Sequence, residues 1–122
     1  MNEFGQSLKD SSLDFAVRIT RFARFLMEEK HDYVLSRQVL KSGTSIGANI
    51  CEAQFAQSDA DFVSKLSIAL KEGAETQYWL EILKRSDFID QVQYESLRND
   101  CDRLVGLLVR TVKTVKQKHN LV

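Results

Sequence analysis

The sequence predicts an all-α protein whose four helices form an antiparallel up-down-up-down bundle in one domain, residues 1–122. Apolar residues recur in four long segments with the ~3.6-residue period of an amphipathic helix, and no segment alternates apolar and polar residues like a half-buried strand. The 122 residues include no proline and five glycines, which disfavours a turn-rich β-sandwich. Long helices joined by short connections pack best as antiparallel neighbours, so a bundle is favoured.

The first helix is predicted at about residues 13–30, with Ser11 and Asp14 at capping-box spacing. The residues on its apolar face are Phe15, Ala16, Ile19, Phe22, Ala23 and Leu26. A polar turn at His31 and Asp32 precedes the second helix, predicted at about residues 33–56. The residues on the apolar face of that helix are Leu35, Val39, Gly43, Ile46, Ile50 and Ala53.

The third helix is predicted at about residues 59–85, after Ser58 and Asp61, which again have capping-box spacing. Its apolar residues are Phe62, Leu66, Ala69, Leu70, Gly73 and Leu80. Asp90 with Gln93 predicts the start of the fourth helix, at about residues 91–118. Its apolar face is the most regular in the chain and comprises Tyr94, Leu97, Cys101, Leu104, Val105, Leu108, Val112 and Val115.

The second helix carries a line of polar residues along one edge of its apolar face. The members of this polar line are Gln38, Ser42, Ser45, Asn49 and Glu52. On the other edge lie Ser36, Gly43 and Gly47, and each glycine inside a helix is about 1 kcal/mol less favourable than alanine. Such glycines predict a close backbone approach. The edge is either a tight, hydrogen-bonded crossing within the chain or a contact with a ligand or a second subunit.

Apolar residues also lie outside the expected core. Ile68, Trp79 and Ile82 fall about 140–220° from Leu66, the centre of the buried face of the third helix. On the first helix, Leu13 and Val17 face outward in the same way. A helix that is apolar on two sides needs two partners, and the simplest second partner is another copy of the chain. These five residues are therefore the candidate interface of a homo-oligomer.

The charges balance overall but not locally. There are 17 basic and 17 acidic residues, yet residues 103–122 contain five cations and no acid. Such an end indicates either a polyanionic partner or cations that complement a helix dipole. A second basic series lies on the first helix, where Phe22 and Phe25 are interleaved with the arginines. The candidate phosphate contacts from the two groups are Arg18, Arg21, Arg24, Arg103, Arg110, Lys113 and Lys116.

No catalytic or metal-binding arrangement is predicted. Glu28 and His31 form a single ExxH pair, whereas a carboxylate-bridged di-metal bundle needs two. Cys101 lies at the centre of an apolar face and is expected to be a core residue. Cys51 lies toward the outer side of its helix, but no neighbouring group would activate its thiol. We therefore expect no cofactor and no small-molecule substrate. No apolar run approaches the ~20 residues that span a bilayer, and the first twelve residues are too polar for a signal peptide, so a cytoplasmic protein without a membrane partner is expected.

Two segments resemble a known family. Residues 37–53 read RQVLKSGTSIGANICEA, and residues 61–80 read DFVSKLSIALKEGAETQYWL. Together they are similar to the 23S rRNA-intervening sequence proteins, and the resemblance covers essentially the whole chain. It implies a four-helix bundle that assembles as a ring, commonly a pentamer. The family is in turn similar to the accessory protein of diversity-generating retroelements, which binds nucleic acid and reverse transcriptase through a basic surface.

The residues and the resemblance lead to one expected function with one alternative. We expect a non-enzymatic homo-oligomer that binds RNA or a nucleoprotein through cations on its surface, with little reading of bases. The alternative is a protein-interaction scaffold with no nucleic-acid role, which would hold its partner through the polar line or the outer face of the third helix.

Overall fold

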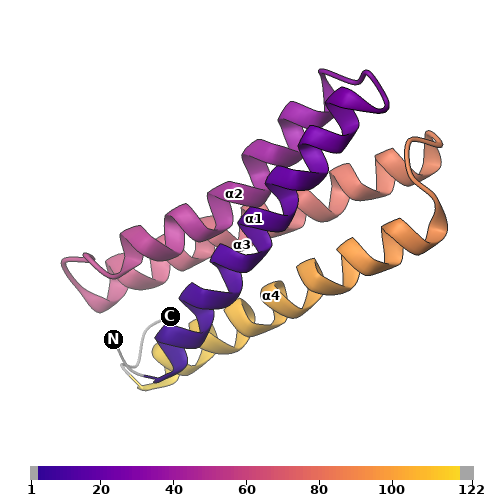
Figure 1. Ribbon diagram of the computed structural model, residues 1–122. Coiled ribbons are helices and arrows are strands. Elements are labelled where there is room, and N and C mark those ends of the chain that lie inside the picture. Colours follow the sequence, from indigo (N-terminus) through magenta and orange to yellow (C-terminus); the bar gives the residue numbers. More distant parts are fainter. Residues whose placement is uncertain (1–2, 119–122) are drawn as a thin grey trace.

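The computed structural model describes residues 3–118, with side chains from residue 7 onward. It contains four helices and, within that range, no strand, so the all-α prediction is confirmed. The helices are α1 (Glu3–Glu28), α2 (Leu35–Ala53), α3 (Asp59–Arg85) and α4 (Gln91–Lys118) (Figure 1). The bounds of α3 and α4 coincide with those predicted. None of the described helices is long and apolar enough to cross a membrane.

The first helix begins ten residues before its predicted start, at Glu3 rather than residue 13. Leu8 is only 2% exposed, because it lies seven residues before the buried Phe15 and therefore on the same helical face. Ser11 is inside the helix, so the capping box predicted there is wrong. The helix also ends earlier than predicted, at Glu28, since His31 adopts a positive φ of 53°.

The second helix is shorter at both ends than the predicted 33–56. Asp32 determines its start, because its carboxylate accepts a hydrogen bond from the backbone N–H of Ser36 at 2.7 Å. The Ser36 hydroxyl donates in return to the Asp32 carbonyl at 2.8 Å. At the other end, the backbone N–H of Phe55 donates to the Glu52 carbonyl at 3.0 Å, a tight bond typical of a closing helical turn.

The predicted caps of α3 and α4 are confirmed. The backbone N–H of Asp61 donates to the Ser58 hydroxyl at 3.1 Å. At the start of α4, the N–H of Gln93 donates to the Asp90 carboxylate at 2.8 Å, and the N–H of Asp90 donates to the Gln93 side chain at 3.1 Å. These bonds satisfy N–H groups that the first helical turn leaves without partners, which fixes where each helix begins.

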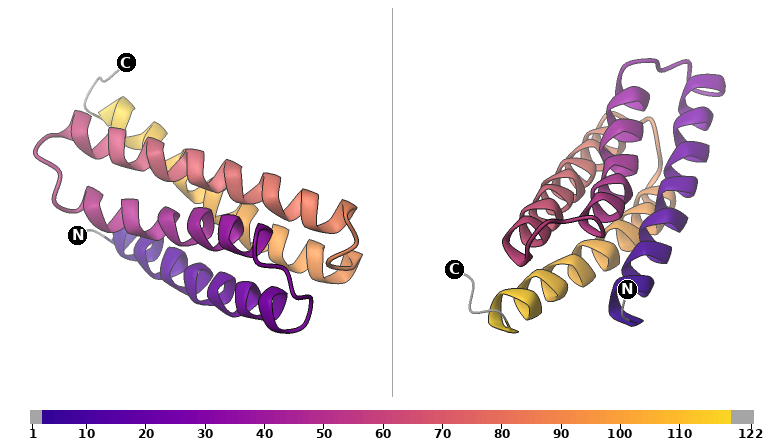
Figure 2. Two further views of the ribbon diagram at one scale, coloured as in Figure 1. Left: turned by 90° about the horizontal axis from the view of Figure 1, so that it is seen from above. Right: turned by 90° about the vertical axis from the view of Figure 1, so that its left-hand side faces the viewer.

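The chain reverses direction at each connection (Figure 1). Each helix packs against the next one along the chain, and α1 also contacts α4. The contact between α1 and α4 is the smallest of the four. Figures 1 and 2 show that these two helices cross at a clear angle instead of running side by side. The molecule is therefore least closely packed between α1 and α4.

All four helices contribute to one apolar core. The bulkiest fully buried side chains include Ile19, Leu26, Ile46, Leu66, Leu80 and Leu108. The buried face of α3 differs from the predicted one, because Val63 and Leu83 are buried while Phe62 and Leu70 are only half-buried. The helical period alone does not distinguish residues at the edge of a stripe from those at its centre.

The close backbone approach predicted from the glycines of α2 is confirmed. A Cβ atom on Gly43 would lie 2.7 Å from Cγ2 of Ile19, and one on Gly47 would lie 3.3 Å from the Ser12 hydroxyl. Two glycines therefore let α2 pack tightly against α1. A third close approach joins α3 and α4, where a Cβ atom on Gly73 would lie 2.7 Å from Cγ2 of Val105.

Candidate functional site

The polar line of α2 turns toward α3. The Thr76 hydroxyl lies 2.9 Å from the buried Ser42 hydroxyl, and Lys65 Nζ lies 3.9 Å from the Glu52 carboxylate. Asn49 donates a hydrogen bond to the carbonyl of Ser45 on its own helix at 2.8 Å. At Ser42 and Glu52, therefore, the polar line holds α2 and α3 together within one chain. The exposed Gln38 and the half-buried Ser45 and Asn49 make no side-chain bond to α3 in the part of the chain that the structure describes.

The candidate interface residues divide into two groups, on α1 and α3, whose backbones do not come close to each other. Leu13 and Val17 on α1 are 60% and 44% exposed, and Ile68 on α3 is 39% exposed. Trp79 and Ile82, in contrast, are half-buried, and Trp79 packs against the core. The Trp79 Nε1 is buried without a hydrogen-bond partner among the described residues.

Two of the seven candidate phosphate contacts are paired with a carboxylate of the chain, and one of them, Arg18, links α1 to α4. Arg18 forms an ion pair with Asp100 and donates to the Ser96 hydroxyl at 2.7 Å, while Arg103 forms a second ion pair with Asp100. Burial raises the pKa of Asp100, but the hydrogen bonds from Arg18 and Arg103 outweigh it and hold that pKa below its ordinary value. Both guanidinium groups therefore have an anionic partner inside the chain.

The other five candidates lie at opposite ends of the molecule. Arg21 and Arg24 are exposed near the end of α1, and Arg110, Lys113 and Lys116 lie in the second half of α4. The bonds from Arg18 to Ser96 and Asp100 place the second half of α1 beside the first half of α4. The second half of α4 is consequently far from Arg21 and Arg24. The sequence therefore identifies the cations correctly as surface groups, but the structure does not bring them together on one surface.

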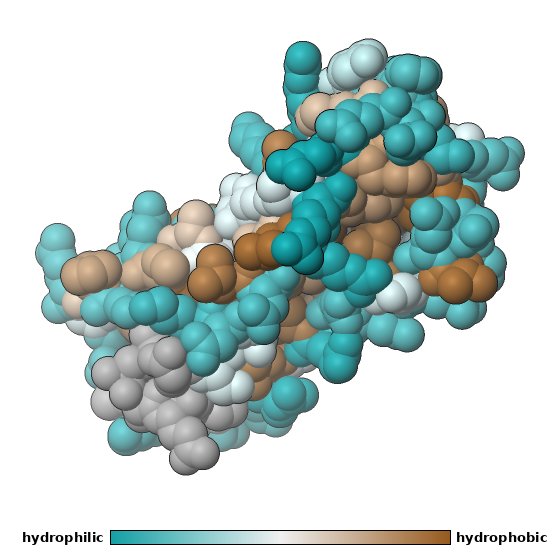
Figure 3. Space-filling view, in the orientation of Figure 1, coloured by the Kyte–Doolittle hydropathy of each residue, from teal (hydrophilic) through white to brown (hydrophobic). Residues whose placement is uncertain are grey.

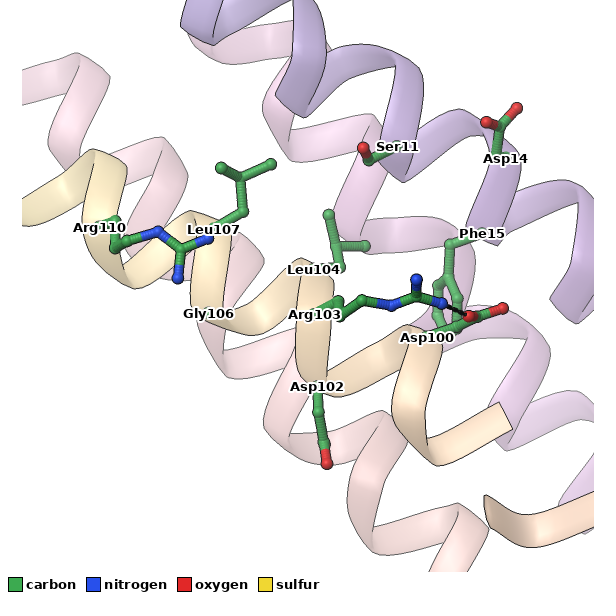
Figure 4. Close-up of a pocket in the computed structure, with 10 residues that line it drawn as sticks. All are labelled: Ser11, Asp14, Phe15, Asp100, Asp102, Arg103, Leu104, Gly106, Leu107 and Arg110. Atoms are coloured by element: carbon green, nitrogen blue, oxygen red, sulfur yellow. Dashed lines mark hydrogen bonds and ion pairs between the residues drawn. The ribbon is translucent and has the colours of Figure 1, made fainter. Parts of the chain in front are cut away.

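A cavity of about 580 Å³ opens between α1 and α4. It has an apolar wall of Phe15, Leu104 and Leu107, and its polar lining includes Asp14 and Arg110. Figure 4 shows Leu107 extending toward α1 and Arg103 directed at Asp100. Figure 3 shows apolar surface between hydrophilic side chains on the face that carries these helices. The periodicity could not reveal this cavity, since it arises from the angle between two helices distant in sequence.

Two titratable side chains of the described residues, Cys101 and Glu72, have pKa values that burial raises. Cys101 is buried with Sγ 3.7 Å from the Gly73 carbonyl oxygen, and burial raises the pKa of its thiol to about 12. Burial and the neighbouring Glu75 raise the pKa of Glu72. Within the described residues, no three His, Cys, Asp or Glu side chains are placed to hold a metal ion. These side chains offer neither a thiolate at neutral pH nor a cluster of metal ligands.

Comparison with known proteins gives a family and similar solved structures. The sequence model of the 23S rRNA-intervening sequence protein family matches residues 7–110. A crystal structure of a protein with unknown function, from the S23 ribosomal protein family of Bacteroides thetaiotaomicron VPI-5482, is 53% identical to this chain. The match covers 90% of this chain and 98% of that one, with a TM-score of 0.89. Among curated proteins, none shows significant similarity.

Proposed function

The chain belongs to the 23S rRNA-intervening sequence protein family, and on that premise we propose that it is a non-enzymatic, homo-oligomeric module that binds RNA or a nucleoprotein. The proposed subunit is an up-down-up-down bundle. The proposed assembly is a ring, and the family resemblance implies that such a ring is commonly a pentamer. The observation that carries the proposal is the second half of α4, where Arg110, Lys113 and Lys116 follow one another without an intervening acid.

The chemistry of this surface suits a phosphate backbone. Arg110 and Lys113 are exposed, Lys116 is half-buried, and none of the three forms an ion pair with another described residue. Cations that are free of internal partners can replace the counterions condensed on a nucleic acid, and release of those counterions drives binding. Because such contacts do not read base edges, binding is expected to depend weakly on sequence. Repetition around a ring would multiply a modest field from each subunit.

Binding should be tested by titrating fluorescent single-stranded RNA with the protein at several salt concentrations. The three phosphate contacts on α4 should contribute about −2 to the slope of log K against log[salt]. Replacing Arg110, Lys113 and Lys116 together by alanine should weaken binding roughly tenfold to 100-fold at ~0.1 M salt and flatten this slope. A control variant, Lys71→Ala with Arg85→Ala, removes two cations from α3 and should change binding little. Absence of binding at low salt, or affinity that salt does not change, contradicts the proposal.

Self-association is tested on the exposed apolar pair of α1. Leu13→Glu with Val17→Glu places two charges on a proposed interface, and we expect the mass measured by light scattering to fall by at least one subunit, since buried unpaired charge is strongly unfavourable. Val34→Glu with Val92→Glu changes two valines that are 69% and 76% exposed near the helix connections, and should leave the mass unchanged. A wild-type protein that is monomeric at micromolar concentration would exclude the homo-oligomer.

A protein-interaction scaffold is the second candidate, because the polar line is not wholly used within the chain. Gln38 is exposed, and the α2–α3 contacts from Ser42 to Thr76 and from Glu52 to Lys65 place Asn49 level with the exposed Ile68. A surface that mixes amides, hydroxyls and an isoleucine is typical of protein interfaces. Charge reversal at Arg110 and Lys113 distinguishes the two functions, because it should strongly weaken RNA binding and leave such docking intact.

A further inference from the structure

Resting on the nucleic-acid binding proposed above, we propose that the α1–α2 hairpin carries a second, separate site for single-stranded nucleic acid. This hairpin site is defined by three arginines, one lysine and an exposed tyrosine, namely Arg21, Arg24, Arg37, Lys41 and Tyr33. Two of these residues belong to α1, two to α2 and one to the connection between them. The sequence alone does not single out Arg37, Lys41 and Tyr33, and their place beside Arg21 and Arg24 follows from the structure.

The distribution of ion pairs singles out these arginines. The chain has eight arginines, and four of them form ion pairs with a carboxylate of the described chain: Arg18, Arg85, Arg98 and Arg103. Of the other four, Arg110 lies on α4, and the remaining three are Arg21, Arg24 and Arg37. A guanidinium without an internal anion is available to a phosphate, which it can bind through two parallel hydrogen bonds.

The packing of α1 against α2 brings the cations to one level. Gly43 contacts Ile19, and the two helices run in opposite directions. Arg24 lies five residues beyond Ile19, and Arg37 lies six residues before Gly43, so the same rise along each helix carries both to the same height. Their neighbours Phe22, Ala23 and Val39 are buried, whereas all four cations are exposed. The cations therefore share the outer side of the hairpin.

The three arginines of the hairpin site form no ion pair with the acids of the same segment, Glu28, Glu29 and Asp32. Glu28 follows Arg24 by four residues but forms no ion pair with it. Lys41 lies close enough to Glu72 on α3 to lower the pKa of that carboxyl group in part, against the larger effects of burial and Glu75. The three guanidinium groups therefore remain available to a bound polyanion.

Tyr33 identifies the class of polyanion. It is 52% exposed in the connection between α1 and α2, four residues before Arg37. An exposed aromatic ring beside a basic surface provides a platform on which an unpaired base can stack, and stacking does not require a particular base. An acidic peptide would use the cations but not the ring. The combination therefore favours single-stranded nucleic acid over an acidic protein segment.

The test measures the anisotropy of a fluorescein-labelled oligouridine titrated with the full chain. Arg24→Ala with Arg37→Ala should reduce affinity roughly tenfold at ~0.1 M salt and decrease the slope of log K against log[salt] by about 1.4, that is, about 0.7 for each lost phosphate contact. Tyr33→Leu should weaken binding about tenfold without changing the slope, because it removes stacking and no charge. Far-UV circular dichroism should be unchanged, since all three side chains are exposed.

The controls separate this site from the site on α4. Lys71→Ala with Arg85→Ala removes the same charge from α3 and should leave the slope at its wild-type value. If the α4 triple variant weakens binding while Arg24→Ala with Arg37→Ala does not, the hairpin site is wrong and the proposed function stands. If polyglutamate displaces the RNA at equal charge and Tyr33→Leu has no effect, the site is for an acidic protein segment and the inference is overturned. Wild-type protein that binds no RNA overturns the proposed function itself.

Discussion

Replacing Gly43 by valine is expected to lower the free energy of unfolding by about 3 kcal/mol, the upper part of the range for overpacked cores. A Cβ at this position would lie 2.7 Å from Cγ2, 3.0 Å from Cγ1 and 3.2 Å from Cβ of Ile19. Ile19 is fully buried, so its side chain has no space to move away. Valine adds two methyl groups to the same contact, and α1 and α2 must separate to accommodate them. Urea denaturation followed by circular dichroism measures the loss.

A double-mutant cycle shows whether the loss arises from this contact. Ile19→Ala alone should destabilise by about 2–5 kcal/mol through the cavity it leaves. In the Gly43→Val background the same change also removes the clash, so the two effects should fall short of additivity by about 1–3 kcal/mol. Ala48→Val places a β-branched residue at an exposed position of α2 and controls for helix propensity. Additive effects would contradict a direct contact between Gly43 and Ile19.

The sequence is most informative where a local signal is strong. Ser58 and Asp90 define the starts of α3 and α4 because a side chain caps each helix within three or four residues, and that chemistry is visible in the sequence. The glycines of α2 likewise indicate a tight crossing, since a glycine inside a helix is unfavourable unless something occupies the space of its Cβ. The caps are short-range interactions within the sequence. The tight crossing requires glycine, a residue type that is unusual inside a helix.

The errors occur where the deciding contact is with a distant part of the chain. The first turns of α1 contain few large apolar residues, and the burial of Leu8 depends on the other helices and not on its neighbours in sequence. At Trp79 the difference is one of degree, because the helical wheel places it outside the core face of α3 and the structure shows it half-buried against the core; its role in an interface stays a prediction.

The candidate cations show the same limit more clearly. Periodicity places Arg18 on the polar side of the first helix but does not reveal that Asp100, 82 residues away, neutralises it. It also does not show that Arg37 stands level with Arg24, because the register between two helices depends on which side chains interlock. A sequence can therefore identify which cations are on the surface. Whether each one is free, and which others lie beside it, depends on packing.

The buried thiol of Cys101 makes the stability of the protein sensitive to alkaline pH. Burial raises its pKa from 9.0 to about 12, so the folded protein retains a proton that the unfolded chain releases above pH 9. The contribution of this thiol to stability is complete below pH 9 and is lost as the pH rises toward 12. In that window the free energy of unfolding should fall by about 1.4 kcal/mol for each pH unit, on the order of 4 kcal/mol in total.

Comparison with a variant isolates this contribution from the other groups that titrate in the same range. Tyr94, for example, also has a raised pKa, mainly because of burial, but it is present in both proteins and cancels in the difference. Cys101→Ala should be less stable than wild type at pH 7, because a side chain that is fully buried beside Gly73 is shortened. Above pH 9 the gap should close and then reverse, since only the wild type must keep a buried thiol protonated.

Cys51→Ala is the matched control, because solvent reaches that thiol in the folded protein, and its stability should follow the wild-type profile. Parallel curves for wild type and Cys101→Ala in urea titrations from pH 7 to pH 11 would show that water reaches Cys101 in the folded state.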